Sequence, residues 1–89
     1  MPIQSFACPD THQLFTQGKS ARFANIRDVA VRKLTQLDAA TSLGFMSMSP
    51  GNDLKFYEDA WHVRINQQRR LIFKWGESGP YDVSIDDPH

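Results

Sequence analysis

The stretch that decides the fold runs from Ala60 to Trp75 and reads AWHVRINQQRRLIFKW. Apolar and polar residues alternate on both sides of a polar turn, which is the pattern of a β-hairpin. Directly paired residues share a face, so only a turn of odd length brings the two apolar sets together. We therefore predict a three-residue turn, Gln67 to Arg69. The register then pairs Asn66 with Arg70, Ile65 with Leu71, Val63 with Phe73 and Trp61 with Trp75.

The predicted hairpin has one apolar and one polar face. Six large side chains form the apolar face, which is the candidate core surface: Trp61, Val63, Ile65, Leu71, Phe73 and Trp75. Basic and polar side chains gather on the other face: His62, Arg64, Asn66, Arg70 and Lys74. An antiparallel sheet commonly packs one face on its core and leaves the other solvated. The polar face is therefore where we expect function.

A long amphipathic helix is predicted from about Ala21 to Ala39, with Ser20 as its N-cap. Apolar residues recur at spacings of three and four and form one core-facing stripe: Phe23, Ile26, Ala30, Leu34 and Leu37. Basic residues decorate the other sides of this helix: Arg22, Arg27, Arg32 and Lys33. Both a solvated face and a contact with RNA or a protein partner fit these charges.

Shorter elements complete the predicted domain, which covers residues 1–89. A short strand is expected at 2–7, a helix at 8–17 closed by Gly18, a brief strand at 53–57 and a last strand at 81–85. The connector 41–52 carries Phe45, Met46 and Met48, which we expect to tuck under the core. This order predicts an α+β fold with two N-terminal helices packed on one face of a small antiparallel β-sheet.

Composition excludes several classes of protein. Ten basic and ten acidic residues cancel, so nucleic-acid binding would have to come from a local patch. A lone cysteine, Cys8, allows no intramolecular disulfide and is expected to be a structural thiol at a helix start. No run approaches the ~20 apolar residues of a membrane span, and the start of the chain lacks the pattern of a signal peptide. We expect a cytoplasmic protein with no membrane partner.

The residue types also limit the chemistry. His12, His62 and His89 lack the spacing of a metal site, so neither a metal nor another cofactor is predicted. RNA cleavage without metal needs a base for the 2′-hydroxyl, an acid for the leaving oxygen, and cations for the phosphorane. Arg64 and Arg70 on one face, together with a terminal histidine, supply such a set. A protein-interaction domain without catalysis fits the residues as well.

Short motifs occur in a fixed order along nearly the whole chain. They are IQSF at 3–6, Phe15 with GKS at 18–20, RKL at 32–34, LDAA at 37–40, PGN at 50–52 with Leu54, WxVRIN at 61–66, RLxFxW at 70–75, DV at 82–83 and DxH at 87–89. With this set the chain resembles the HigB-type toxins of bacterial type II toxin–antitoxin systems, within the RelE-like superfamily (the plasmid maintenance killer group). The resemblance implies a RelE-like fold and a metal-independent, ribosome-dependent mRNA endoribonuclease that inhibits translation.

The resemblance also implies site residues and partners. The family's two arginines fall on Arg64 and Arg70, where they would stabilise phosphate charge, and its terminal triplet falls on Asp87-Pro88-His89. His89 would be the general acid or base, with Asp87 orienting it. RNA would be bound by Lys74, Lys55, Gln68, Asn66 and His62. The implied partners are a helix-turn-helix, HigA-like antitoxin, mRNA in the ribosomal A site, and operator DNA only through the antitoxin.

The chain departs from the family pattern at several positions. Pro88 stands where many members have a tyrosine, Arg69 where a tryptophan is common, and Ser49 where some have a histidine. The segment before Trp61 is a few residues shorter. Three alternatives to a ribonuclease toxin follow: a gyrase-poisoning toxin on the same fold, an attenuated, non-catalytic module that binds the antitoxin and regulates, and an unrelated α+β domain.

Overall fold

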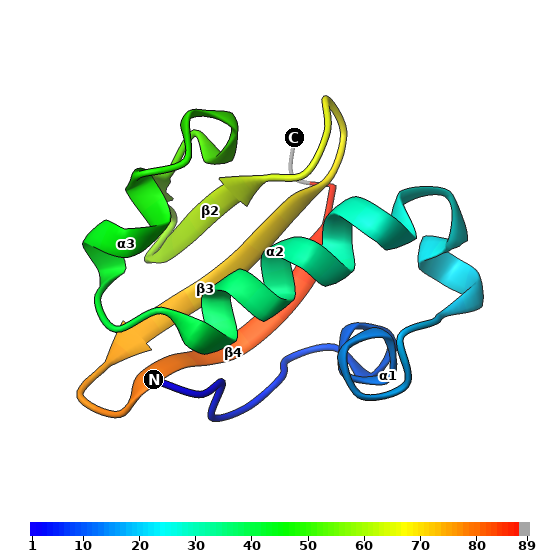
Figure 1. Cartoon of the computed structure of the whole chain (residues 1–89), viewed down its shortest axis with the longest axis horizontal. Coiled ribbons are helices and arrows are strands. Elements are labelled where there is room, and N and C mark those ends of the chain that lie inside the picture. Colours follow the sequence, from blue (N-terminus) through cyan, green and yellow to red (C-terminus); the bar gives the residue numbers. More distant parts are fainter. Residues whose placement is uncertain (88–89) are drawn as a thin grey trace.

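A meander of four antiparallel strands forms the sheet in the computed structural model, which describes residues 1–87 (Figure 1). The strands are β1 (Lys55–Tyr57), β2 (Ala60–Arg64), β3 (Arg70–Gly76) and β4 (Gly79–Asp86), and they lie in that order across the sheet. The helical segments precede the sheet in the chain, and α2 crosses one face of it over β3 and β4 (Figure 1). The predicted α+β class and its antiparallel sheet are confirmed.

Five helical segments come before the strands: α1 (Pro9–Gln17), η1 (Ala21–Ile26), α2 (Arg27–Ala39), α3 (Leu43–Ser47) and η2 (Pro50–Asn52). α1 begins at a proline, which is favoured at the first position of a helix, and it ends before Gly18, which closes it. Gly18 has φ 73°, and its N–H donates to Leu14 O at 2.9 Å. The predicted helix at 8–17 is confirmed, with Cys8 at its N-cap.

The long helix predicted from Ala21 to Ala39 is two segments. Residues 21–26 form a 3₁₀-helix, and Phe23 departs from helical angles with φ −112° and ψ 21°. A spacing of three, as between Phe23 and Ile26, suits a 3₁₀-helix as well as an α-helix, so periodicity alone does not separate them. Ser20 occupies the N-cap position without a side-chain hydrogen bond. The predicted stripe is nonetheless entirely buried.

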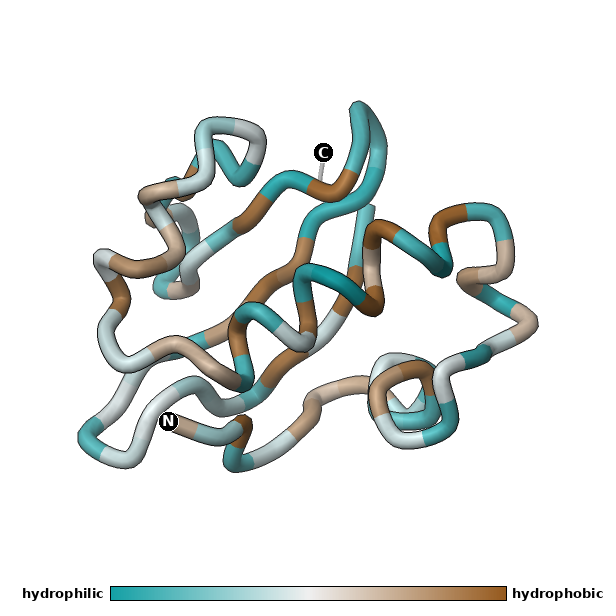
Figure 2. The backbone as a smooth tube through the Cα atoms, in the orientation of Figure 1, coloured by the Kyte–Doolittle hydropathy of each residue, from teal (hydrophilic) through white to brown (hydrophobic). Residues whose placement is uncertain are grey.

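The core lies between this stripe and the apolar face of the sheet, visible as brown segments of α2 and the strands (Figure 2). Its largest fully buried sheet residues are Phe73, Leu71, Ile85, Val63 and Val83. Trp61 and Trp75, which were predicted on the apolar face, are half-buried and pack at the margin of this core. The alternation in the sequence therefore predicted correctly which face of the hairpin is covered.

The predicted register of the hairpin is wrong by two residues. Val63 pairs with Leu71 and Arg64 with Arg70, so the loop comprises residues 65–69 rather than 67–69. The physical reason is the side chain of Asn66, whose Oδ1 accepts the N–H groups of Gln68 at 2.8 Å and Arg69 at 2.6 Å. This Asx-type cap satisfies the loop backbone where the expected turn would have continued the strands. A shift of two preserves the face of every side chain.

The N-terminal segment and the connector also differ from expectation. Residues 2–7 form a single parallel bridge, Phe6 to Val83, rather than a strand, although Gln4 N–H donates to Pro80 O at 2.8 Å. Of the three connector side chains expected under the core, only Met46 is buried, whereas Phe45 and Met48 are exposed. Phe45 in the short helix α3 and Met48 directly after this helix both turn their side chains outward.

Lys33 is buried, which the expectation of a solvated helix face did not anticipate. Its Nζ donates to Asn52 Oδ1 at 2.8 Å, and Asn52 Nδ2 donates to Met46 O at 2.8 Å. This network ties the connector to α2. Burial, with the nearby charges of Arg32 and Arg64, lowers the pKa of Lys33.

Candidate functional site on the open face of the sheet

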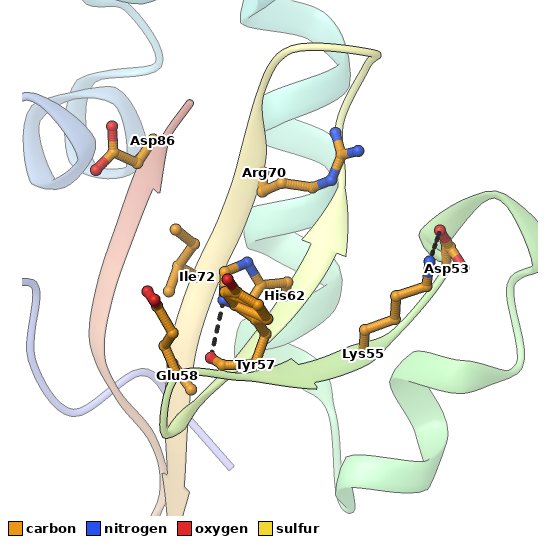
Figure 3. Close-up of a pocket in the computed structure, with 9 residues that line it drawn as sticks. Asp53, Lys55, Tyr57, Glu58, His62, Arg70, Ile72 and Asp86 are labelled. Atoms are coloured by element: carbon orange, nitrogen blue, oxygen red, sulfur yellow. Dashed lines mark hydrogen bonds and ion pairs between the residues drawn. The ribbon is translucent and has the colours of Figure 1, made fainter. Parts of the chain in front are cut away.

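A hollow of about 590 Å³ lies on the face of the sheet that α2 does not cover (Figure 3). It draws side chains from just after the end of η2, from β1, from the β1–β2 turn and from the three following strands. The lining residues are Asp53, Lys55, Tyr57, Glu58, Ala60, His62, Arg70, Ile72 and Asp86. A site of this kind gathers residues distant in sequence on a rigid platform, as binding sites do.

Strand register places these side chains on one face. Lys55 pairs with His62, His62 pairs with Ile72, and Arg70 pairs with Asp86. Directly paired residues project to the same side of a sheet, and alternate residues of one strand do so as well. The sequence pattern that buries Leu71 and Phe73 therefore turns Arg70 and Ile72 into the hollow.

Arg70 is half-buried and firmly held. Its Nη1 donates to the carbonyl oxygens of Asn66 at 2.5 Å and Arg69 at 3.1 Å, which fixes the guanidinium at the hairpin loop. The charged ends of Arg70 and Asp86 point in opposite directions although the residues pair across the strands (Figure 3). Among the ion pairs of residues 1–87, none includes Arg70. Its charge is thus available to an anion in the hollow.

His62 lies in the middle of the site. Its Nε2 is 3.2 Å from Tyr57 O, and its ring meets the Tyr57 ring edge-on, with centroids 5.9 Å apart and an interplanar angle of 89°. Both contacts come from Tyr57, the last residue of β1. They hold the imidazole in one orientation against the neighbouring strand (Figure 3).

The hollow has mixed charge. Lys55 Nζ lies 3.4 Å from Asp53 Oδ2 in a largely exposed ion pair, which contributes little to stability and opens at little cost. Glu58 adds another carboxylate from the turn, where its backbone has φ 49°. Two cationic side chains, Lys55 and Arg70, therefore share the lining with three carboxylates, Asp53, Glu58 and Asp86. The arrangement is suited to an anion that enters between them rather than to a broad polyanion surface.

Some predicted site residues are not brought into this hollow. Arg64 is exposed, directly opposite Arg70 in the register, and close enough to Lys33 to affect the pKa of that lysine. Lys74 pairs with Tyr81, and its four-residue separation from Arg70 corresponds to about 13 Å along a strand. Asn66 and Gln68 line a separate hollow on the hairpin loop.

The C-terminal residues of the predicted site are only partly described. Asp87 follows β4, and its N–H donates to the Asp86 side chain at 2.8 Å. Pro88 and His89 lie outside the described residues. Of the predicted set, the structure therefore unites Lys55, His62 and Arg70 in one hollow.

Tyr57 and Glu58 are lining residues that the sequence pattern did not single out. A signal was present, because Tyr57 is two residues beyond Lys55 and so shares its face in any extended strand. Within residues 1–87, no three histidine, cysteine, aspartate or glutamate side chains cluster so as to hold a metal ion. Over the same residues, every helix is too short or too polar to cross a lipid bilayer.

A four-stranded antiparallel sheet with α2 across one face is the RelE-like arrangement that the sequence pattern predicted. A family model described as "RelE-like toxin of type II toxin-antitoxin system HigB" matches residues 4–89, so the chain belongs to the HigB-like toxin family. It is similar to Toxin HigB-1 of Vibrio cholerae serotype O1, with 34% identity over 70 residues that cover 74% of this chain and 73% of the relative. Membership in such a system implies an antitoxin partner.

Proposed function

We propose that this toxin is a metal-independent, ribosome-dependent mRNA endoribonuclease and that the hollow around Arg70 is its site. The observation that carries the proposal is the convergence of Arg70, Lys55 and His62 on the uncovered face of the sheet. An arginine fork engages two phosphate oxygens at once, and a held fork loses little entropy on binding. Arg70 is held by two loop carbonyls.

The proposed reaction is transfer of the RNA phosphate to its own 2′-oxygen. A base takes the 2′-hydroxyl proton, the 2′-oxygen attacks phosphorus, and the bond to the 5′-oxygen breaks. Arg70, assisted by Arg64, stabilises the charge that develops on the phosphorane. The products are a 2′,3′-cyclic phosphate and a free 5′-hydroxyl.

His89 is proposed as an acid or base of this reaction, with Asp87 orienting it. Support comes from the chain connection: Asp86 is the cross-strand partner of Arg70, and His89 follows three residues later. The imidazole group titrates near neutrality and serves either role.

RNA is proposed to extend from the hollow along the sheet face. Lys55 and His62 contact it beside the scissile phosphate, while Lys74 lies farther along β3 and Asn66 and Gln68 lie at the loop. The remaining proposed partners are a helix-turn-helix, HigA-like antitoxin, the ribosomal A site, and operator DNA bound only through the antitoxin. Because the proposed target is the translating ribosome, the proposed location is the cytoplasm.

Mapping of new mRNA 5′-ends in a translation reaction tests the function. The wild type is expected to produce discrete new ends, which Arg70→Ala and His89→Ala abolish and the control Arg22→Ala retains. Arg22 lies outside the hollow, in the 3₁₀ segment η1. The proposal fails if wild type produces no new ends, or if both site variants cut as wild type does. DNA-damage signalling without cut mRNA would favour gyrase poisoning instead.

A non-catalytic regulatory module is the second candidate. The observation that favours it is the presence of Asp53, Glu58 and Asp86 in the same hollow, since carboxylates oppose phosphate binding. Unopposed expression separates the candidates: a ribonuclease arrests growth, whereas a regulatory module leaves growth unchanged and still binds its antitoxin.

A further inference from the structure

His62 is hydrogen-bonded to the backbone through Nε2, and within residues 1–87 its Nδ1 makes no side-chain or backbone hydrogen bond. A backbone carbonyl only accepts hydrogen bonds, so the 3.2 Å contact with Tyr57 O requires a hydrogen on Nε2. In the neutral ring, Nδ1 then carries a lone pair and no hydrogen. The edge-on Tyr57 ring, with its centroid 5.9 Å away, restricts rotation of the imidazole. The contacts thus select the tautomer in which Nδ1 is the base.

The neighbours of His62 suit this nitrogen to act on a phosphate ester. Lys55 on β1 pairs directly with His62. On β3, His62 pairs with Ile72, and Arg70 lies two residues from Ile72 and therefore on the same face of the sheet. Diagonal neighbours of this kind are separated by about 7–8 Å, which leaves room for a phosphate group between them. Three carboxylates also line the hollow. Glu58 belongs to the β1–β2 turn, Asp53 precedes β1, and Asp86 is the last residue of β4.

We propose that His62 Nδ1 is the general base that removes the 2′-hydroxyl proton, a role that rests on the proposed ribonuclease function. The proton passes to Nδ1, the 2′-oxygen forms its bond to phosphorus, and the bond from phosphorus to the 5′-oxygen breaks. The leaving oxygen takes a proton from His89 or from water, and His62 returns its proton to solvent. This assignment divides the two histidines, with His62 as the base and His89 as the acid.

The tautomer is measured without any activity assay. Long-range ¹H–¹⁵N NMR of the ¹⁵N-labelled full chain at neutral pH is expected to show His62 protonated at Nε2. A His62 ring protonated only at Nδ1 would overturn the assignment, because Nδ1 would then have no lone pair for the proton.

The kinetic test compares His62→Gln with His12→Gln in the mRNA cleavage reaction. Glutamine can still donate to Tyr57 O but supplies no base, so cleavage is expected to fall about 100-fold. A protonated imidazole cannot accept the 2′-hydroxyl proton, so the wild-type rate should fall as the pH is lowered. His62→Gln should lose that acidic limb and retain the alkaline one. His12, an exposed residue of α1 outside the hollow, should behave as wild type.

The outcomes distinguish a wrong assignment of the general base from a wrong proposal of ribonuclease function. If wild type cuts RNA and His62→Gln cuts within about threefold of it, with the same pH profile, His62 is not the base although the toxin is a ribonuclease. If wild type does not cut, both proposals fail together. Circular dichroism melts of His62→Gln and of a second variant, His62→Asn, establish that loss of cleavage occurs in folded protein.

Discussion

Replacement of Asn66 by alanine should destabilise the protein through the hairpin loop. The change removes an acceptor that holds the N–H groups of Gln68 at 2.8 Å and Arg69 at 2.6 Å. Each such bond contributes about 0.5–1.5 kcal/mol net, and this loop is partly exposed, so a loss of about 1–2 kcal/mol is expected. For a domain of this size, 1 kcal/mol corresponds to a shift of about 4–8 °C in Tm.

The effect should extend to Arg70, because its Nη1 donates to the Asn66 carbonyl oxygen. A loop that opens more readily holds the guanidinium less firmly, so Asn66→Ala should also slow RNA cleavage. Urea unfolding measures the stability change as a lower midpoint at an unchanged slope. The same samples provide the cleavage rate.

Asn66→Asp is the matched control for the cap, since aspartate keeps the acceptor oxygen while it replaces the amide donor with a second oxygen and adds a negative charge. We expect Asn66→Asp to unfold near the wild-type midpoint. Equal destabilisation by alanine and aspartate would refute the capping role, as would an alanine variant as stable as wild type. A stable Asn66→Asp variant with strongly weakened RNA cleavage would instead indicate that RNA passes close enough to this position to be repelled by the added negative charge.

Three further predictions concern other parts of the molecule. Gly79 has φ 109°, and a Cβ there would lie 2.6 Å from Met1 Cβ. Gly79→Ala should therefore lower the free energy of unfolding, measured in urea, by about 1–3 kcal/mol. Gly51→Ala is the control, because a Cβ at Gly51 meets nothing within 4 Å and should lower it far less. Tyr57 exposes its ring in the hollow, so Tyr57→Ala should weaken binding of short single-stranded RNA by about 1–3 kcal/mol in fluorescence anisotropy; unchanged affinity would exclude stacking. Burial lowers the pKa of Lys33 from 10.5, so between the lowered value and 10.5 the unfolded chain binds more protons than the folded one. The free energy of unfolding of wild type should therefore rise relative to that of Lys33→Met as the pH rises through this window. A difference between the two proteins that stays constant with pH would contradict a lowered pKa.

Local signals in the sequence predicted the elements whose causes are local. Proline after Cys8 and glycine at position 18 bound α1 because both act through their own backbone angles. Alternation assigned the hairpin faces correctly. Its register was missed because a shift of two residues leaves every face unchanged, and the deciding interaction is a side-chain cap from Asn66.

The candidate site was predictable to the extent that it follows from strand faces. Lys55, His62 and Arg70 meet because each lies on the polar side of its strand. Lys33 was missed because its burial depends on the connector folding back onto α2 through Asn52, a contact between residues far apart in sequence. Periodicity within one helix carries no information about such a contact.

Single-turnover cleavage of mRNA held on purified ribosomes tests the central claim most directly, with wild type and Arg70→Ala compared after urea unfolding has established that both are folded. A preorganised donor to a developing oxyanion is commonly worth about 100–1,000-fold in rate. We therefore predict cleavage by wild type and a loss of at least about 100-fold in Arg70→Ala. Equal rates in the two proteins, or no cleavage by wild type, would contradict the assignment of the open-face hollow as a ribonuclease site.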